Sequence, residues 1–141
     1  MCDITLTSPG NTFAFSETKL GLIPSVISTY VIRRIGPARA RRLFITGERF
    51  SSECAKEIGL IDYLVDYDKI DENIEQIIKE IKKSGPLAVG EAKNLIKANQ
   101  EMSIQQYKEF TINKIAELRI SKEGQEGTTA FLEKRKPRWR I

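Results

Sequence analysis

The sequence contains no histidine, and its two cysteines, Cys2 and Cys54, stand far apart without a CxxC motif. The missing imidazole excludes Ser-His-Asp and Cys-His catalysis, and most zinc sites, within this chain. The cysteine spacing favours neither a disulfide framework nor a thiolate zinc site, so we expect both thiols to be reduced and packed. Carboxylates, lysines, tyrosines and backbone donors are the groups left for chemistry.

Long apolar runs are missing as well. One of the longest covers residues 30–32, whereas a helix that crosses a bilayer needs roughly 20 apolar residues. The N-terminus carries Asp3 and lacks the basic start and apolar block of a secretory signal. The sequence predicts no membrane partner and, by default, a cytoplasmic protein.

Positive charge is in modest excess, since 23 lysines and arginines face 19 acidic residues and give a net charge of +4. Such an excess favours anionic ligands where it is clustered. Five arginines form one run along the chain: Arg33, Arg34, Arg39, Arg41 and Arg42. They raise the hypothesis of RNA binding, but no RNP motif, aromatic platform or zinc finger accompanies them. Apolar residues interleave with them, which favours the solvated sides of amphipathic helices over a nucleic-acid partner.

The first half of the sequence mixes short strands with helices. Residues 3–7 and 12–15 have strand patterns on either side of a Pro-Gly turn. Helices are predicted at residues 25–35 and 37–47, and from Ser51 or Ser52 to Gly59, because proline and serine suit helix starts and glycine suits helix ends. A strand follows at residues 60–65. This order fits the edge of a mixed α/β core.

After Asp66 the pattern is helical throughout. Four isoleucines at helical spacing predict one apolar face: Ile74, Ile77, Ile78 and Ile81. Pro86 opens a second helix, whose expected buried side carries Ala88, Ala92, Leu95 and Ile96. Ser103 and Gln106 form a capping box before a long helix, and a last helix runs from near Ser121 to before Pro137. We therefore divide the chain into residues 1–66 and 67–141.

Glu17 is the sharpest catalytic candidate, because it lies between a short apolar strand and a helix that begins near Pro24. By position alone, a solvated turn residue is the commoner interpretation. Five segments resemble the C-terminal half of an enoyl-CoA hydratase/isomerase, the crotonase superfamily: SETKLGLIP (16–24), RARRLFITG (39–47), Arg49-Phe50, AKEIGLI (55–61) and EGTTAFLEKRKPRW (126–139).

The resemblance implies an α/β, predominantly helical fold, the C-terminal half of a crotonase (ClpP/crotonase-like) fold. Residues 1–66 would be the remnant of the spiral core, and residues 67–141 the helical trimerisation region. It also implies a lyase of fatty acid metabolism with an acyl-CoA substrate, assembled as a homotrimer or a dimer of trimers. No metal or redox cofactor is implied, because coenzyme A enters as part of the substrate.

The implied reaction assigns Glu17 a role as one of two catalytic glutamates. Adding water to a 2-enoyl thioester needs a base that activates the water and an acid that protonates the α-carbon. The developing enolate oxygen must be held by pre-aligned donors. In the family these donors are two backbone N–H groups, so the protein supplies the required groups without a cofactor.

One departure from the family concerns the opening residues. The family's GGG-x-E segment, with one oxyanion donor and the other glutamate, precedes a stretch similar to MCDI, with which this sequence begins. We therefore expect this chain alone to be inactive, since losing one oxyanion donor costs about two to three orders of magnitude in rate. The alternative is a non-catalytic oligomerisation or binding fragment.

Another departure follows Pro24. Many hydratases of the family have a glycine-rich run there, whereas this chain has Ser25, Val26, Ile27 and Ser28. Similar versions occur in the branch that resembles methylglutaconyl-CoA or geranoyl-CoA hydratases, which puts straight-chain specificity in doubt. Ser25 is a candidate for substrate contact, although we expect it to cap the helix.

The tail carries the remaining candidates. By resemblance, Phe131 would line the acyl pocket of a neighbouring subunit and Lys134 would lie near the adenine or phosphates of coenzyme A. The alternative is structural, because Phe131 and Leu132 have ordinary core spacing, and basic residues are common where a helix dipole ends.

Overall fold

The computed structural model describes residues 2–140, which form two compact units. Within the described residues, the first unit ends at Ile74 and the second begins at Glu75. The division falls inside helix α4 (Ile70–Ile81), whereas the boundary expected from composition lies ahead of it. The roles assigned to residues 1–66 and 67–141 stay predictions.

The strands of the first unit form two separate pairs. β1 (Leu6–Thr7) runs parallel to β4 (Tyr63–Leu64), and β2 (Thr12–Ala14) runs antiparallel to β3 (Arg49–Ser51). The strands predicted at residues 3–7 and 12–15 are thus real but shorter, and they pair with later segments. Two-stranded ribbons are marginal by themselves in water. Both pairs therefore depend on the packing around them.

The helices of the first unit follow their sequence signals closely. α1 (Ser25–Ile35) ends before Gly36, and α2 (Pro37–Thr46) begins at its proline and ends before Gly47. Gly47 has a φ of 53°, the left-handed conformation that favours glycine at a helix end. Ser51 caps α3 (Ser52–Glu57) by accepting a hydrogen bond from the Cys54 N–H. These predictions are confirmed.

The core of the first unit lies where these helices meet β2 and β3. Its buried hydrophobic residues are Phe15, Val31, Ile35, Ala40, Leu43, Phe50, Ala55 and Ile58. Phe15 packs edge-on against Phe44 with 5.3 Å between ring centroids, and it also contacts Phe50 at 5.8 Å. The aromatic cluster fixes the backbone immediately before Glu17.

A polar clamp joins three parts of this unit. The Arg34 guanidinium contacts the Asp62 carboxylate at 2.6 Å and donates a hydrogen bond to the Gly59 carbonyl at 2.8 Å. The other oxygen of Asp62 accepts hydrogen bonds from the Thr5 N–H and hydroxyl at 2.8 and 2.9 Å. The clamp therefore holds α1 and the approaches to β1 and β4 together.

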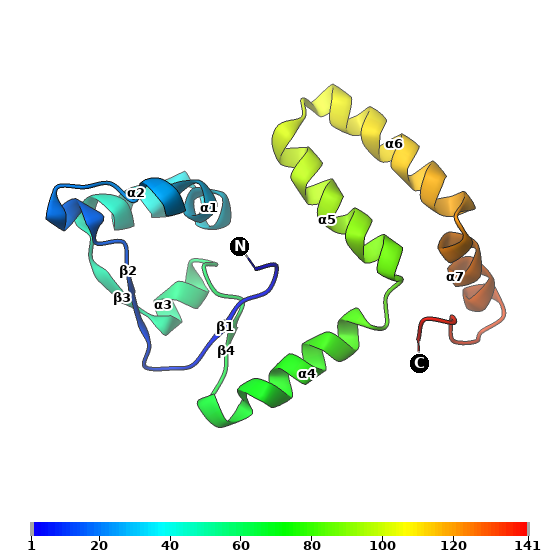
Figure 1. Cartoon of the computed structure of the whole chain (residues 1–141), viewed down its shortest axis with the longest axis horizontal. Coiled ribbons are helices and arrows are strands. Elements are labelled where there is room, and N and C mark those ends of the chain that lie inside the picture. The colour runs from blue at the N-terminus through cyan, green and yellow to red at the C-terminus, as the bar shows by residue number, and fades with distance from the viewer. Residues whose placement is uncertain (1, 141) are drawn as a thin grey trace. The chain divides into compact units, whose positions relative to one another are not determined.

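The second unit is helical, with α5 (Pro86–Glu101), α6 (Ile104–Ile120) and α7 (Lys122–Leu132). α5 and α6 lie side by side (Figure 1). The predicted capping box of Ser103 and Gln106 is confirmed. Glu123, from α7, accepts hydrogen bonds from the Leu87 and Ala88 N–H groups at the start of α5, at 2.9 and 2.8 Å. Its negative charge complements the positive end of that helix dipole.

Little of the second unit's apolar surface is buried. Among its described residues, the buried hydrophobic ones are Ala98 and Ala130. The predicted buried side of α5 is wrong for this chain, since Ala88 and Ala92 are exposed and Ile96 is 65% exposed. The physical reason is that α5 has too few neighbours within the unit to cover that side. Separately, among residues 2–140, no helix is long and apolar enough to cross a membrane.

Candidate active site

Glu17 lies at the start of η1 (Glu17–Leu20), a 3-10 helix that the sequence patterns did not predict. Its Oε2 atom is buried and has no hydrogen-bond partner among residues 2–140. A buried carboxylate oxygen without a partner is costly, because water that would solvate it has been removed. Such an atom is a candidate for contact with a ligand or with further polypeptide.

The backbone around Glu17 is held on both sides. Phe15 is anchored in the core, and the Thr18 hydroxyl donates a hydrogen bond to the Phe44 carbonyl at 2.9 Å. A side chain at Gly47 would press against Thr18 and Lys19, so this glycine also lets η1 approach the end of α2. Sequence reasoning assigned Gly47 only a helix-ending role and missed Thr18. The two residues position the carboxylate without touching it.

An apolar surface follows Glu17 along the chain. Leu22, Ile23 and Val26 are 61%, 72% and 82% exposed, and Leu20 is 75% exposed. Large aliphatic side chains exposed this close together in sequence are typical of segments that another molecule or segment covers. The surroundings of Glu17 therefore present unsatisfied polar and apolar groups together.

Ser25 is exposed and does not cap α1 as expected. Pro24 occupies the position before the helix, and no side chain forms a capping hydrogen bond there. Ser25 is already the first helical residue, so its hydroxyl is not placed as a cap requires. A substrate contact of Ser25 stays a prediction.

Two members of the arginine run make intramolecular ion pairs. Arg34 contacts Asp62, and the Nε of Arg42 lies 3.3 Å from the Glu48 carboxylate. These contacts agree with arginines on the solvated sides of α1 and α2.

The tail residues Phe131 and Lys134 lie at the end of α7. Phe131 is 81% exposed, so the alternative that it packs into a core of this chain is wrong. Lys134 has a φ of 55°, and the Lys134 and Arg135 N–H groups bond back to the Phe131 and Ala130 carbonyls. This is a Schellman ending, in which glycine is the usual residue at the left-handed position. A lysine is held there at some backbone cost.

Glu126 fixes the segment that follows. It accepts two hydrogen bonds from the Arg135 guanidinium, at 2.7 and 3.1 Å, and one from the Arg138 N–H at 3.0 Å. The bonds from Arg135 lower the pKa of Glu126 from its ordinary 4.5 to about 2. The tail is therefore fastened to α7 by a carboxylate that stays charged in mild acid.

The pH dependence of this attachment is predictable. Because the pKa of Glu126 is lower in the folded state, its stabilisation is fully present above about pH 4.5 and is lost as the pH falls through about 2. Trp139, the only tryptophan, reports it, since its ring lies against Gly127. We expect Trp139 fluorescence to be unchanged at pH 4 and to shift towards that of solvated tryptophan near pH 2.

Glu126→Gln is the control for that titration. It removes the charge, so the shifted Trp139 emission should be present already at pH 7 and the step near pH 2 should disappear. A wild-type transition centred above pH 4 would contradict the assignment.

Comparison with known proteins places the whole chain in one family. The sequence model of the family described as enoyl-CoA hydratase/isomerase matches residues 1–141. Carnitinyl-CoA dehydratase of Proteus mirabilis is 30% identical over 145 residues, which cover 98% of this chain and 55% of the relative. The chain thus spans about half the length of the curated relatives it matches.

Solved structures agree with this result. AtuE of Pseudomonas aeruginosa superimposes with a TM-score of 0.93 at 32% identity, over 99% of this chain and 54% of that one. An enoyl-CoA hydratase of Shewanella pealeana gives a TM-score of 0.88 at 38% identity, over 97% of this chain and 51% of that one. The architecture is that of the C-terminal half of a crotonase fold, and the chain belongs to the enoyl-CoA hydratase/isomerase family, within the crotonase superfamily.

Proposed function

We propose that this chain is the C-terminal part of an enzyme that hydrates or isomerises a 2-enoyl-CoA thioester through an enolate. The observation that carries the proposal is the buried, unpartnered Oε2 of Glu17, within a chain of the enoyl-CoA hydratase/isomerase family. A side chain held in this way can receive a proton from water as a carboxylate, and can deliver one to carbon as a carboxyl group.

Glu17 would transfer the proton next to the thioester. As a base, its carboxylate takes a proton from the attacking water; as an acid, its carboxyl protonates the α-carbon of the enolate. Thr18 and Phe15 hold the backbone on either side of it, so the carboxylate keeps its orientation as the charge changes. Under this proposal no metal or redox cofactor is needed, because backbone donors stabilise the enolate.

The remaining polypeptide of the fold would complete the site. Besides the exposed aliphatic residues after Glu17, the first unit has an apolar groove of about 370 Å³ lined in part by Phe13, Ile27 and Leu60. These surfaces, and the unpaired edges of the short strands, are where we place the part of the relatives that this chain does not match.

Reconstitution tests the proposed function. The chain would be produced with, or fused behind, the part of AtuE that it does not match, and hydration of crotonyl-CoA followed by loss of the enoyl thioester absorbance. We expect no turnover by the chain alone and clear turnover by the combination. A soluble, folded combination without turnover, towards crotonyl-CoA and 3-methylglutaconyl-CoA alike, would reject the proposal.

The tail would complete the substrate site of a neighbouring subunit in a homotrimer or dimer of trimers. The exposure of Phe131 supports this role, since an 81% exposed phenylalanine at a helix end is available to a second surface. The left-handed backbone of Lys134 supports a contact between its ammonium group and coenzyme A. A lysine at a position that favours glycine costs free energy, which a ligand contact would offset. Ser25 is proposed as a further substrate contact.

Exposed isoleucines on α6 favour the second candidate, a non-catalytic oligomerisation fragment. Ile104, Ile112 and Ile115 are 91%, 57% and 64% exposed, and a self-associating chain would bury them. The reconstitution separates the two, because only the enzyme gains turnover.

A further inference from the structure

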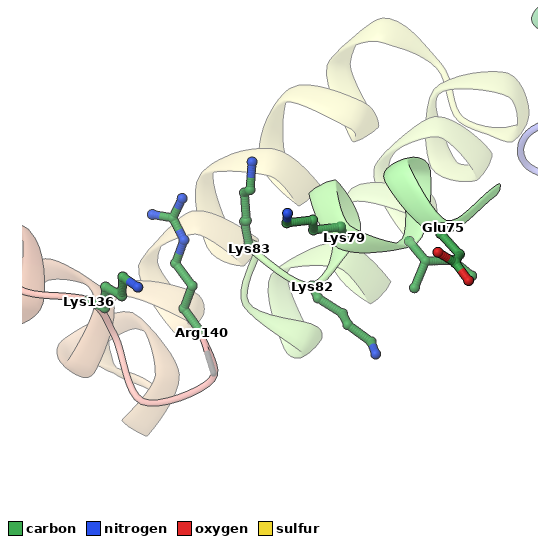
Figure 2. A pocket seen from close by; sticks show the side chains of 7 residues that line it. Glu75, Lys79, Lys82, Lys83, Lys136 and Arg140 are labelled. Carbon is green, nitrogen blue, oxygen red and sulfur yellow. The ribbon is translucent and has the colours of Figure 1, made fainter. Parts of the chain in front are cut away.

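The second unit contains a basic groove of about 590 Å³ (Figure 2). Its lining residues are Glu75, Ile78, Lys79, Lys82, Lys83, Lys136 and Arg140. Below, the basic groove means the space lined by these residues. Three of its cations come from the end of α4 and its flank, and two from the C-terminal tail. Its volume is that of a site for a small molecule.

Side chains from both segments converge in the groove. In Figure 2, Lys83 and Arg140 project in the same direction, Lys79 points towards Lys83, and Lys136 points towards Arg140. Glu75 lies at the far end of the groove from the tail. Lys79 and Lys83 from one segment therefore lie beside Lys136 and Arg140 from the other, whereas Lys82 points away from them.

The convergence is built into the fold of the tail. The Trp139 indole N–H donates to the Lys83 carbonyl at 3.4 Å, which joins the tail to the turn that follows α4. The bonds from Arg135 and the Arg138 N–H to Glu126 fix the turn between Lys136 and Arg140. Both segments are thus anchored by contacts in which the side chains of Lys79, Lys82, Lys136 and Arg140 take no part.

Among residues 2–140, carboxylates do not balance the positive charge of the groove. Lys83 pairs with Glu80, but among residues 2–140 no carboxylate lies within ion-pair distance of Lys79, Lys82, Lys136 or Arg140. The five cations, set against Glu75 and Glu80, leave three positive charges in excess. Like charges gathered in this way repel one another unless an anion lies between them.

We propose that the basic groove binds the diphosphate group of a small molecule. A diphosphate carries two to three negative charges near neutral pH and offers several acceptor oxygens, which suits ammonium groups on one side and a guanidinium on the other. The groove's small size and its two short contributing segments favour this ligand over a nucleic-acid backbone, which needs a longer track of cations. The inference does not depend on Glu17 or on the proposed reaction.

Binding to the full chain tests the proposal. Pyrophosphate, ADP and coenzyme A share the diphosphate, and each would be titrated by calorimetry and by the fluorescence of Trp139, which neighbours Arg140 in sequence. We expect pyrophosphate to bind and to compete with whichever of the other two binds more tightly. Comparing the affinities for ADP and coenzyme A shows which of these two molecules the groove prefers. Competition with pyrophosphate shows that the ligands bind in the same groove.

Paired variants place the site. Lys79→Gln with Arg140→Gln removes one cation from each segment and should weaken pyrophosphate binding at least about tenfold. The matched control, Lys97→Gln with Arg119→Gln, removes the same charges from exposed positions outside the groove and should bind as wild type does. Circular dichroism confirms that each variant keeps its helices.

Three outcomes would overturn the proposal: no binding of pyrophosphate, equal weakening by the two double variants, or tighter binding of a single-stranded oligonucleotide or of anionic phospholipid vesicles than of the small diphosphates. The last would assign the groove to a macromolecular surface.

Discussion

Replacing Glu17 by glutamine in the reconstituted enzyme should lower kcat for crotonyl-CoA hydration by about 10²- to 10⁴-fold. Glutamine keeps the shape of the side chain but can neither take a proton from water nor give one to carbon. Substrate binding should change little, because glutamine fills the same space and can still form a hydrogen bond, so KM should stay nearly constant. Steady-state kinetics at saturating and limiting substrate separate the two effects.

Glu57→Gln is the matched control for that experiment. Glu57 is exposed, lies in the same unit and is a carboxylate of the same type, so this change should leave kcat within about twofold of wild type. A Glu17→Gln enzyme with unchanged kcat would show that the buried oxygen has a structural role only.

The second large effect concerns stability. Leu43→Ala should lower the free energy of unfolding of the first unit by about 2–5 kcal/mol, because Leu43 is fully buried and its removal leaves a cavity. α2 also carries the Phe44 carbonyl that holds Thr18, so the setting of Glu17 should loosen with it. Hydrogen exchange read by mass spectrometry measures this loss unit by unit.

The exchange pattern should be selective. Peptides from α1 and α2 should lose protection in Leu43→Ala, while peptides from α5 and α6 keep theirs. Ile45→Ala provides the control, since Ile45 lies on the same helix and is 71% exposed, and it should cost less than about 0.5 kcal/mol. Equal effects of the two substitutions would contradict the described core.

Local rules predicted much of this fold. The starts of α1 and α2, the glycine ends at Gly36 and Gly47, and the serine caps at Ser51 and Ser103 each depend on contacts within a few residues. Such contacts are present in the sequence itself. The resemblance supplied the family, and the comparisons confirmed it.

Long-range pairing was not predictable in the same way. β1 pairs with β4 and β2 with β3, across separations that no local pattern encodes. The buried side expected for α5 was wrong because helical spacing tells which residues share a face, not whether anything covers it. Ile96 shares that face and is nevertheless 65% exposed.

The candidate site shows the same division. Glu17 could be chosen from its segment, but its buried Oε2 and the bond from Thr18 to Phe44 needed coordinates. The basic groove joins residues 79–83 with residues 136–140, and only the folded tail brings them together. The sequence signal for this groove was two basic stretches, residues 79–83 and 134–136. The second stretch also has an ordinary explanation, because basic residues are common where a helix dipole ends.

The most direct test of the catalytic role is a crystal structure of the reconstituted enzyme with a bound 3-hydroxyacyl-CoA. Our account predicts that a carboxylate oxygen of Glu17 lies about 2.6–3.2 Å from the 3-hydroxyl or, through one water, from the α-carbon's proton. A Glu17 side chain directed into bulk solvent, with the thioester bound elsewhere, would contradict it.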